Sequence, residues 1–267
     1  MQRRLLLLNN AGKEGTKNYA PSVFDATERY RNYFKSPLGG YWDDGEIIEM
    51  PTDLKPDCQS VWLSATVDYL NTLTTYSMIV FTGHGGAVIK GYNKEECIEL
   101  LGGNLFPISS LCASHSKIKR TVIIDACRCF TWLNESVQLD KDRMSVKELT
   151  KDLNAIDCRD YYNELISDLP EHYELIQSTQ LGEVARASQT GSVFCDALFT
   201  IIYGQASTWN MAALCNNNHV TCKSTEELVH GADGIMSPIG QHPQFSTNCL
   251  TTERFPFYAV RRQSKLI

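Results

Sequence analysis

Two stretches decide the fold: Met78-Ile79-Val80-Phe81-Thr82-Gly83-His84-Gly85-Gly86 and Arg120-Thr121-Val122-Ile123-Ile124-Asp125-Ala126-Cys127-Arg128. Each contains a short run of apolar, mostly β-branched residues, which is typical of a strand buried on both faces. A histidine follows the first run and a cysteine follows the second. Ligands bind beyond the carboxyl ends of parallel strands in an open α/β sheet. We therefore expect an imidazole and a thiol at one edge of the same sheet.

Working outward, strand and helix patterns alternate along the chain, which indicates an α/β fold with a mostly parallel sheet covered on both faces. We predict one domain over residues 1–267, with a flexible, partly helical linker at about 129–171. Besides the two strands above, the pattern predicts strands at 3–9, 46–50, 173–178 and 255–260. It predicts helices at 23–34, 61–73, 94–101, 108–113, 192–203, 208–214 and 225–230.

The composition excludes several classes of protein. The net charge of −6 and the lack of a basic cluster argue against a nucleic-acid surface. No apolar run reaches the roughly 18 residues of a transmembrane helix, so no membrane partner is expected. The apolar start at residues 5–8 is too short for a signal peptide and is interpreted as a core strand. Ten cysteines spread through a chain of this size favour a reducing, cytoplasmic location.

The histidine and cysteine are suited to nucleophilic catalysis. A thiol attacks a carbonyl as the thiolate, and a neighbouring imidazole promotes its deprotonation. We expect Cys127 to be the nucleophile and His84 its base, with the backbone N–H groups of Gly85 and Cys127 as donors to an oxyanion. The structural alternative is a core cysteine and a polar residue at a strand end.

Other chemistries fit less well. Gly83-His84-Gly85-Gly86 is similar to the oxyanion loop of lipases, but no Gly-x-Ser-x-Gly nucleophile elbow follows it. No Gly-x-Gly-x-x-Gly follows the first strand, which argues against a dinucleotide site. Cys215, His219, Cys222 and His230 match no common structural zinc spacing. We therefore expect neither a metal nor a cofactor.

At these residues the chain resembles the caspase-like cysteine peptidases, which include caspases, metacaspases and paracaspases. Thr82-Gly83-His84-Gly85 is similar to their Ser-Gly-His-Gly, and Asp125-Ala126-Cys127 matches the Asp-x-Cys motif of metacaspases and paracaspases. Supporting similarities are Leu8-Asn9-Asn10, Phe24-Asp25-Ala26, Gln241-His242-Pro243-Gln244 and Phe255-Pro256-Phe257. The resemblance implies a mostly parallel six-stranded sheet with helices on both faces.

The resemblance also implies specificity. In metacaspases the positions matching Asp25 and Asp125 line the pocket for an Arg or Lys before the scissile bond, and a carboxylate pair suits a guanidinium. Asp125 lies two residues before Cys127, so strand alternation directs both to one face. The alternative for Asp25 is a charge on the surface near a helix start.

We therefore expect a cysteine endopeptidase that cleaves a protein substrate after Arg or Lys, in a regulatory, defence or cell-death pathway. Calcium dependence is not expected, because Asp125 is the only aspartate in residues 85–126 and Glu95, Glu96 and Glu99 are interpreted as a solvated helix face. Caspases dimerise and metacaspases are usually monomers, so monomer and homodimer both stay open. Two alternatives are a caspase-fold scaffold that binds a partner without cleaving it, and an Asp-specific hydrolase, which an acidic pocket disfavours.

Overall fold

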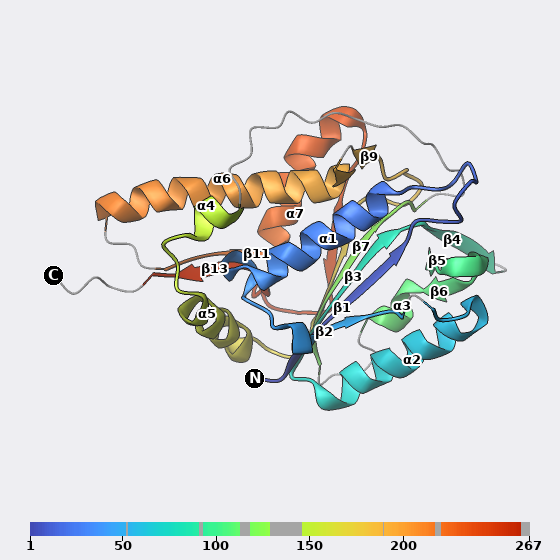
Figure 1. The fold of residues 1–267 in the computed structure, drawn as a ribbon, viewed down its shortest axis with the longest axis horizontal. Helices are drawn as coiled ribbons and strands as arrows, with labels where there is room; N and C mark the ends of the chain where they lie inside the picture. The colour runs from blue at the N-terminus through green and yellow to red at the C-terminus, as the bar shows by residue number, and fades with distance from the viewer. Residues whose placement is uncertain are drawn as a thin grey trace.

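The computed structural model describes residues 1–51, 53–90, 93–112, 118–128, 146–188, 190–216 and 220–262. Its centre is a six-stranded sheet in the order β12-β8-β7-β3-β1-β2 (Figure 1). Five neighbouring strands of this sheet, β8, β7, β3, β1 and β2, run parallel to one another. The sixth strand, β12, pairs with β8 in the antiparallel direction. The bounds are β1 Arg3–Asn10, β2 Ile47–Glu49, β3 Tyr76–Gly83, β7 Lys119–Ala126, β8 Tyr173–Gln177 and β12 Gln244–Thr247. The predicted α/β fold with a mostly parallel six-stranded sheet is confirmed.

Helices cover both faces of this sheet, because successive strand side chains point to opposite sides. One core lies between the sheet and α1, α5, α6 and α7, and takes Leu5 and Leu7 from β1. The second lies beneath α2 and α3 and takes Leu6 and Leu8. The bounds are α1 Ser22–Lys35, α2 Pro56–Leu73, α3 Ile108–Leu111, α4 Val146–Thr150, α5 Ala155–Asp168, α6 Val193–Asn216 and α7 Thr225–Met236.

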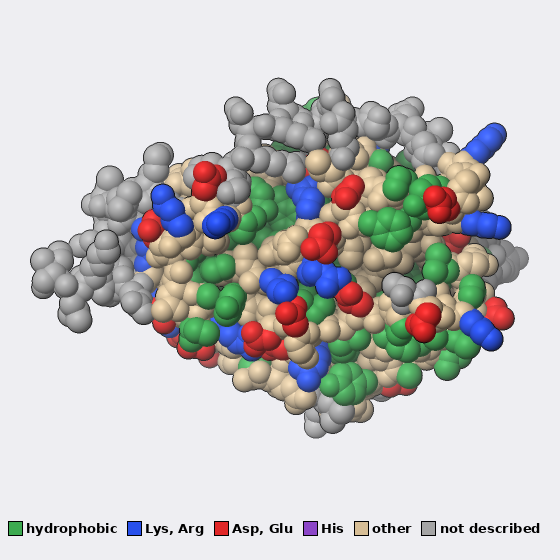
Figure 2. Space-filling view, in the orientation of Figure 1, with side chains coloured by type: hydrophobic (Ala, Val, Ile, Leu, Met, Phe, Trp, Pro, Cys, Tyr) green, Lys and Arg blue, Asp and Glu red, His purple; other side chains and the backbone are tan. Residues whose placement is uncertain are grey.

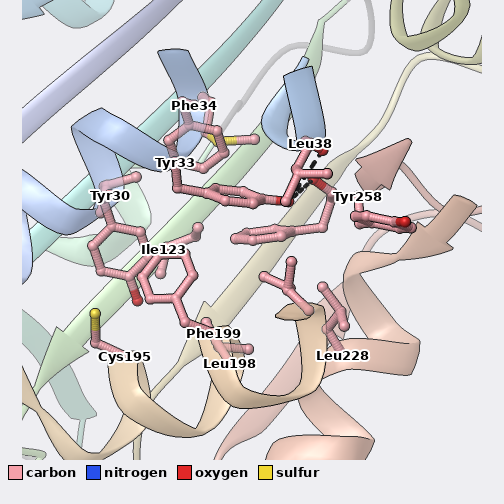
Figure 3. Close-up of a cluster of buried hydrophobic side chains, with 14 of the residues drawn as sticks. Tyr30, Tyr33, Phe34, Leu38, Ile123, Cys195, Leu198, Phe199, Leu228 and Tyr258 are labelled. Atoms are coloured by element: carbon pink, nitrogen blue, oxygen red, sulfur yellow. Dashed lines mark hydrogen bonds between the residues drawn. The ribbon is translucent and has the colours of Figure 1, made fainter. Parts of the chain in front are cut away.

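The first core is rich in aromatic side chains (Figure 3). Tyr33 stacks on Phe257 with ring centroids 5.3 Å apart, and its hydroxyl donates to the Phe257 carbonyl oxygen over 2.7 Å. Phe199 of α6 packs against both Tyr30 and Tyr33 at 5.5 and 5.2 Å. These contacts join α1, α6 and the segment near the chain end on one face of the sheet.

One predicted helix is wrong, while the predicted strand at 255–260 is confirmed as β13 Pro256–Arg261. This strand pairs with β11 Val220–Ser224 in a separate two-stranded sheet, and β12 is the sixth strand of the main sheet. The predicted helix at 94–101 is instead β5 Asn93–Glu99, between β4 Gly85–Lys90 and β6 Leu105–Pro107. Lys and Glu favour a helix locally, but pairing with the glycine-led strand β4 overrides this preference.

The predicted linker holds two helices in its described part. Residues 129–145 lie outside the described residues, while α4 and α5 occupy 146–150 and 155–168. Cys158, Tyr162 and Ile166 of α5 are fully buried in the first core. The helices predicted at 192–203 and 208–214 are one continuous helix, α6. The remaining short elements are η1 Pro37–Gly39, η2 Asp44–Glu46, η3 Leu101–Gly103, η4 Ser237–Ile239, β9 Ala187–Ser188 and β10 Gly191–Ser192.

On the face viewed in Figure 2, acidic and basic side chains are interspersed. Arg31 on α1, for example, pairs with Glu28 and with Glu49. Across the described residues, no helix is both long and apolar enough to cross a membrane. Eight cysteines in these residues are free thiols.

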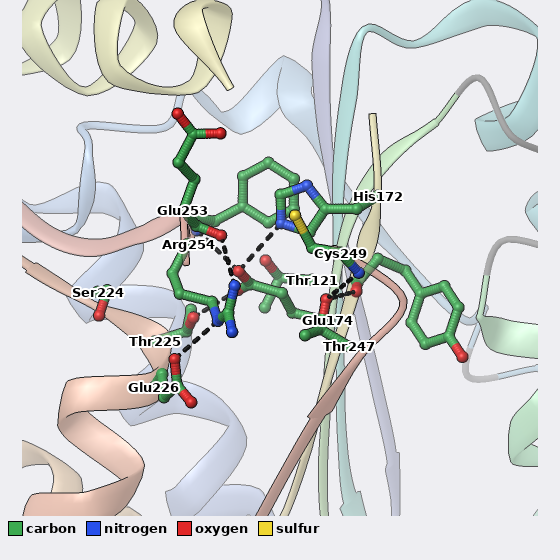
Figure 4. A network of polar contacts seen from close by, with 12 residues as sticks. Thr121, His172, Glu174, Ser224, Thr225, Glu226, Thr247, Cys249, Glu253 and Arg254 are labelled. Carbon is green, nitrogen blue, oxygen red and sulfur yellow. Dashed lines mark hydrogen bonds and ion pairs between the residues drawn. The ribbon is translucent and has the colours of Figure 1, made fainter. Parts of the chain in front are cut away.

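A buried polar network ties β8 to α7 and to the segment before β13 (Figure 4). The Glu174 carboxylate is fully buried and accepts hydrogen bonds from the Thr225 hydroxyl and from the Phe255 backbone N–H, the latter over 2.8 Å. The Nε2 atom of His172 lies 3.2 Å from the Glu174 Oε1. The His172 ring also stacks on Phe255, with ring centroids 4.1 Å apart. The network therefore fixes the start of α7 against the sheet.

Replacing Glu174 by Ala is expected to lower the free energy of unfolding by about 3 kcal/mol, because it leaves buried donors without an acceptor. Urea denaturation measures the change. Glu171→Ala, at an exposed acid three residues away, is the matched control and should stay within about 0.5 kcal/mol of wild type. Equal effects of the two substitutions would contradict the role given to the network.

Candidate active site

The pairing of β3 with β7 sets His84 and Cys127 side by side. The two strands are parallel, and Gly83 is the register partner of Ala126. His84 and Cys127 are the next residues of the two strands, so both leave the sheet at its carboxyl edge. Both side chains are buried, at 7% and 8% exposure, and both line one cavity. The geometry thus brings together the two residues that the sequence singles out.

The His84 ring lies against the loop that follows β1. A Cβ at Gly12 would come within 2.9 Å of the His84 Nε2, and Gly12 has a φ of +77°, so this position requires glycine. The Gly12 N–H donates to the Asn10 side-chain oxygen over 3.0 Å, and the Asn10 amide donates to the Glu99 carbonyl oxygen over 2.8 Å. These bonds fix the loop against which the imidazole packs.

The Cys127 sulfur is held by the backbone of Ala185. The Ala185 N–H donates to Sγ over 3.2 Å, and Sγ lies 3.6 Å from the Ala185 carbonyl oxygen, in position for the thiol to donate. One peptide segment thus offers an acceptor to the thiol and a donor to the thiolate. No sequence signal predicts this contact, because Ala185 lies 58 residues from Cys127 in a segment without a distinctive motif.

The predicted oxyanion donors are adjacent. A Cβ added at Gly85 would come within 3.0 Å of the Cys127 carbonyl oxygen and 3.1 Å of the Ala126 Cβ, so the close approach to the end of β7 favours glycine. Cys127 lines the cavity, whereas Gly85 does not line it and lies against the same strand end. The role of their N–H groups stays a prediction.

Asp125 lies in the wall of the same cavity, as strand alternation predicts. It is only 4% exposed, and its Oδ2 accepts a hydrogen bond from Ser192. Its Oδ1 has no hydrogen-bond partner within the described part of the chain. Burial raises the pKa of Asp125 from 3.8 to about 7, against the opposing effect of the Ser192 hydrogen bond. This is a buried acid with one oxygen left for a ligand.

Asp25 differs from this expectation. It is exposed in the first turn of α1 and does not line the cavity, whereas its neighbours Ser22, Val23 and Ala26 do. The helical spacing turns residues 22, 23 and 26 toward the sheet and residue 25 away from it. The structure therefore unites His84, Cys127 and Asp125 and leaves Asp25 on the surface.

The glutamates at 95, 96 and 99 are not a helix face. They lie on β5, and the Glu96 carboxylate pairs with the guanidinium of Arg128 and accepts from the Gln177 amide over 2.7 Å. Arg128 also donates to the Thr179 carbonyl oxygen over 2.8 Å. The residue after the cysteine thus anchors the neighbouring strand ends. Among the described residues, no group of three or more His, Cys, Asp or Glu side chains could hold a metal ion. His219 lies outside the described residues.

Residues 185–187, 191 and 192 also line the cavity. Arg186, half-buried, and Ser192 line it together with Gly191. Ser192 also accepts from the Cys195 N–H over 2.9 Å at the start of α6. The only local signal for Ser192 in the sequence is a small polar residue before a well-patterned helix.

Asp125 makes stability depend on pH. Its pKa is higher in the folded chain than in the unfolded one, so the folded state binds the extra proton between about pH 4 and pH 7. The unfolding free energy therefore falls as pH rises through this window. Asp125→Asn removes this pH dependence. Between pH 5 and pH 8, the free energy of unfolding of the variant should therefore rise by about 2 to 3 kcal/mol relative to that of the wild type. Urea denaturation at both pH values measures it, and a difference independent of pH would contradict it.

Comparison with known proteins agrees with this geometry at the level of the fold. No protein-family model and no curated protein matches the sequence. Among solved structures, protein GSU0716 from Geobacter sulfurreducens superposes with a TM-score of 0.55 at 13% identity, covering 92% of this chain and 93% of that one. Caspase-1 from Spodoptera frugiperda superposes with a TM-score of 0.51 at 12% identity, covering 99% and 91%. At such identities the likeness shows the fold alone: this chain has a caspase-like fold.

Proposed function

We propose that the protein is a cysteine endopeptidase that uses a His84–Cys127 dyad and cleaves a protein substrate after Arg or Lys. The observation that carries the proposal is the convergence of His84, Cys127 and Asp125 on one cavity. A nucleophile, a base and a buried acid in a single concave site form a set that a purely structural role does not require.

The chemistry follows from the positions of these groups. His84 takes the proton of Cys127, and the thiolate attacks the scissile carbonyl carbon. The N–H groups of Gly85 and Cys127 donate to the oxyanion. His84 then returns the proton to the leaving amine, which breaks the peptide bond and leaves an acyl-enzyme. Water, deprotonated by His84, attacks the thioester and releases the acid product and the thiol.

Asp125 supports the preference for a basic side chain. An ionised carboxylate in a buried site is costly unless it is paired. A guanidinium or ammonium group from the substrate would supply the partner that Oδ1 lacks among the described residues. Arg186 lines the same cavity, which makes an acidic residue the competing choice. Asp125 is favoured as the specificity residue because it is the more deeply buried of the two.

Several finer points belong to the same proposal. The Asp-x-Cys motif supports the metacaspase or paracaspase type. We propose activity without calcium, because Asp125 is the only aspartate in residues 85–126, and without a cofactor. A contribution of Asp25 would require a movement of α1's first turn or a longer substrate that reaches the surface. We further propose that the protein is cytoplasmic and acts on a protein substrate, as a monomer or a homodimer. The pathway would be one of regulation, defence or cell death. A scaffold without activity is the alternative.

Fluorogenic peptides that differ only at the residue before the scissile bond test the proposal. Arg and Lys peptides should be cleaved in preference to Asp and Ala peptides. Cys127→Ala should abolish cleavage, and Asp125→Asn should lower kcat/KM for the Arg peptide by about 100-fold, the effect of losing a charged partner in a buried site. Cys58→Ala, at an exposed thiol remote from the cavity lining, is the matched control. Cleavage that survives Cys127→Ala, or a preference for the Asp peptide, would contradict the proposal.

A further inference from the structure

The segment that holds the Cys127 sulfur is itself held by a side chain far away in the sequence. Residues 178–186, here named the Ala185 loop, connect β8 to β9 and carry the Ala185 N–H that donates to Sγ. The start of the loop is fixed on β7: the Ser178 N–H donates to the Ile124 carbonyl oxygen over 2.9 Å, and the Ala126 N–H donates to the Ser178 hydroxyl over 3.1 Å.

The tip of the loop is fixed beside the nucleophile. The Arg128 N–H donates to the Glu183 carbonyl oxygen over 3.1 Å, and the Gly182 N–H donates to the Arg128 carbonyl oxygen over 3.2 Å. These bonds hold residues 182 and 183 but leave the position of Ala185 to be set from its other side, at Arg186.

Gln241 makes that connection. Its side chain is fully buried, its amide nitrogen donates to the Ser178 carbonyl oxygen over 3.0 Å, and its amide oxygen accepts from the Arg186 N–H over 3.1 Å. One amide thus joins the two ends of the Ala185 loop. Arg186 follows Ala185 directly, so the bond to its nitrogen fixes the peptide plane that carries the Ala185 carbonyl oxygen. The next plane along the chain carries the Ala185 N–H that donates to the sulfur.

We propose that Gln241 is a positioning residue for the Cys127 thiolate: it bridges Ser178 and Arg186 and so holds the Ala185 N–H on the sulfur. A donor to sulfur favours the thiolate over the thiol, and its effect depends on distance and alignment. Neither group of the Gln241 side chain touches the sulfur, so the residue acts through Ala185 alone. The inference rests on the proposed function for its catalytic meaning, but the thiolate itself can be measured without a substrate.

The test follows alkylation of Cys127 by iodoacetamide as a function of pH. Mass spectrometry of the tryptic peptide from Thr121 to Arg128 isolates Cys127, because this peptide contains no other cysteine. Gln241→Met keeps the length of the side chain and removes both hydrogen bonds. Alkylation of Cys127 in this variant should be about tenfold slower at pH 7, with its midpoint moved to higher pH. Gln241→Glu, which keeps the acceptor for Arg186 but loses the donor to Ser178, should shift the profile in the same direction.

Gln244→Ala is the matched control, because Gln244 lies three residues on, is exposed, and its side chain bonds only to the Pro243 carbonyl oxygen among the described contacts. Its alkylation profile should equal that of wild type. Thermal unfolding of each variant separates positioning from stability. The proposal is overturned if Gln241→Met folds, at whatever stability, and its alkylation profile equals that of wild type.

Gln241→Asn provides a second route if Gln241→Met does not fold. It keeps an amide at this buried position but is one methylene shorter, so it cannot reach both the Ser178 carbonyl oxygen and the Arg186 N–H. The alkylation profile of this variant should move in the same direction by a smaller amount. An unchanged profile in folded Gln241→Asn would overturn the proposal. Failure of the wild-type protein to cleave basic peptides, with these alkylation shifts intact, would refute the proposed function and leave the role of Gln241 standing.

Discussion

The candidate site depends on one constraint, the parallel pairing of β3 with β7 in a register that opposes Gly83 to Ala126. Because both strands run in the same direction, the residues that follow this pair, His84 and Cys127, emerge at the same edge of the sheet. A shift of one residue would bury one of the two reactive side chains on the wrong face. The two hydrophobic cores on opposite faces of the sheet fix this register, since every second strand residue is committed to one of them.

Much of this arrangement was predictable from the sequence, and the reasons are local. Short β-branched runs predicted β3 and β7, and alternation along β7 predicted that Asp125 shares the cavity with Cys127. The prediction failed where pairing or packing overrides the local preference, or where no local signal exists. β5 contains Lys and Glu and forms a strand only because β4 lies beside it. Ala185 lies in no motif, and the stretch around Gln241 that resembles the family does not reveal what its side chain does. Both residues act through hydrogen bonds to positions 58 and 55 residues away in the sequence.

Asp125 shows how a site of this kind trades stability for recognition. Burial raises its pKa to about 7, so ionising it in the free protein costs free energy that a well-packed apolar residue would not. Ser192 satisfies one of its oxygens, at the start of α6. A basic substrate would satisfy the other, so the proposed specificity and the unfavourable burial have the same cause. Asp25, by contrast, is exposed on the surface of α1.

The most direct measurement is covalent labelling with a peptidyl chloromethyl ketone that ends in Arg, with mass spectrometry to locate the adduct. The alkylation of an activated thiolate requires the nucleophile, its base and the pocket to act together. We expect rapid modification of Cys127, a much slower reaction with the matching reagent that ends in Asp, and loss of this difference in Asp125→Asn. Equal labelling by both reagents, or an adduct on another cysteine, would contradict it.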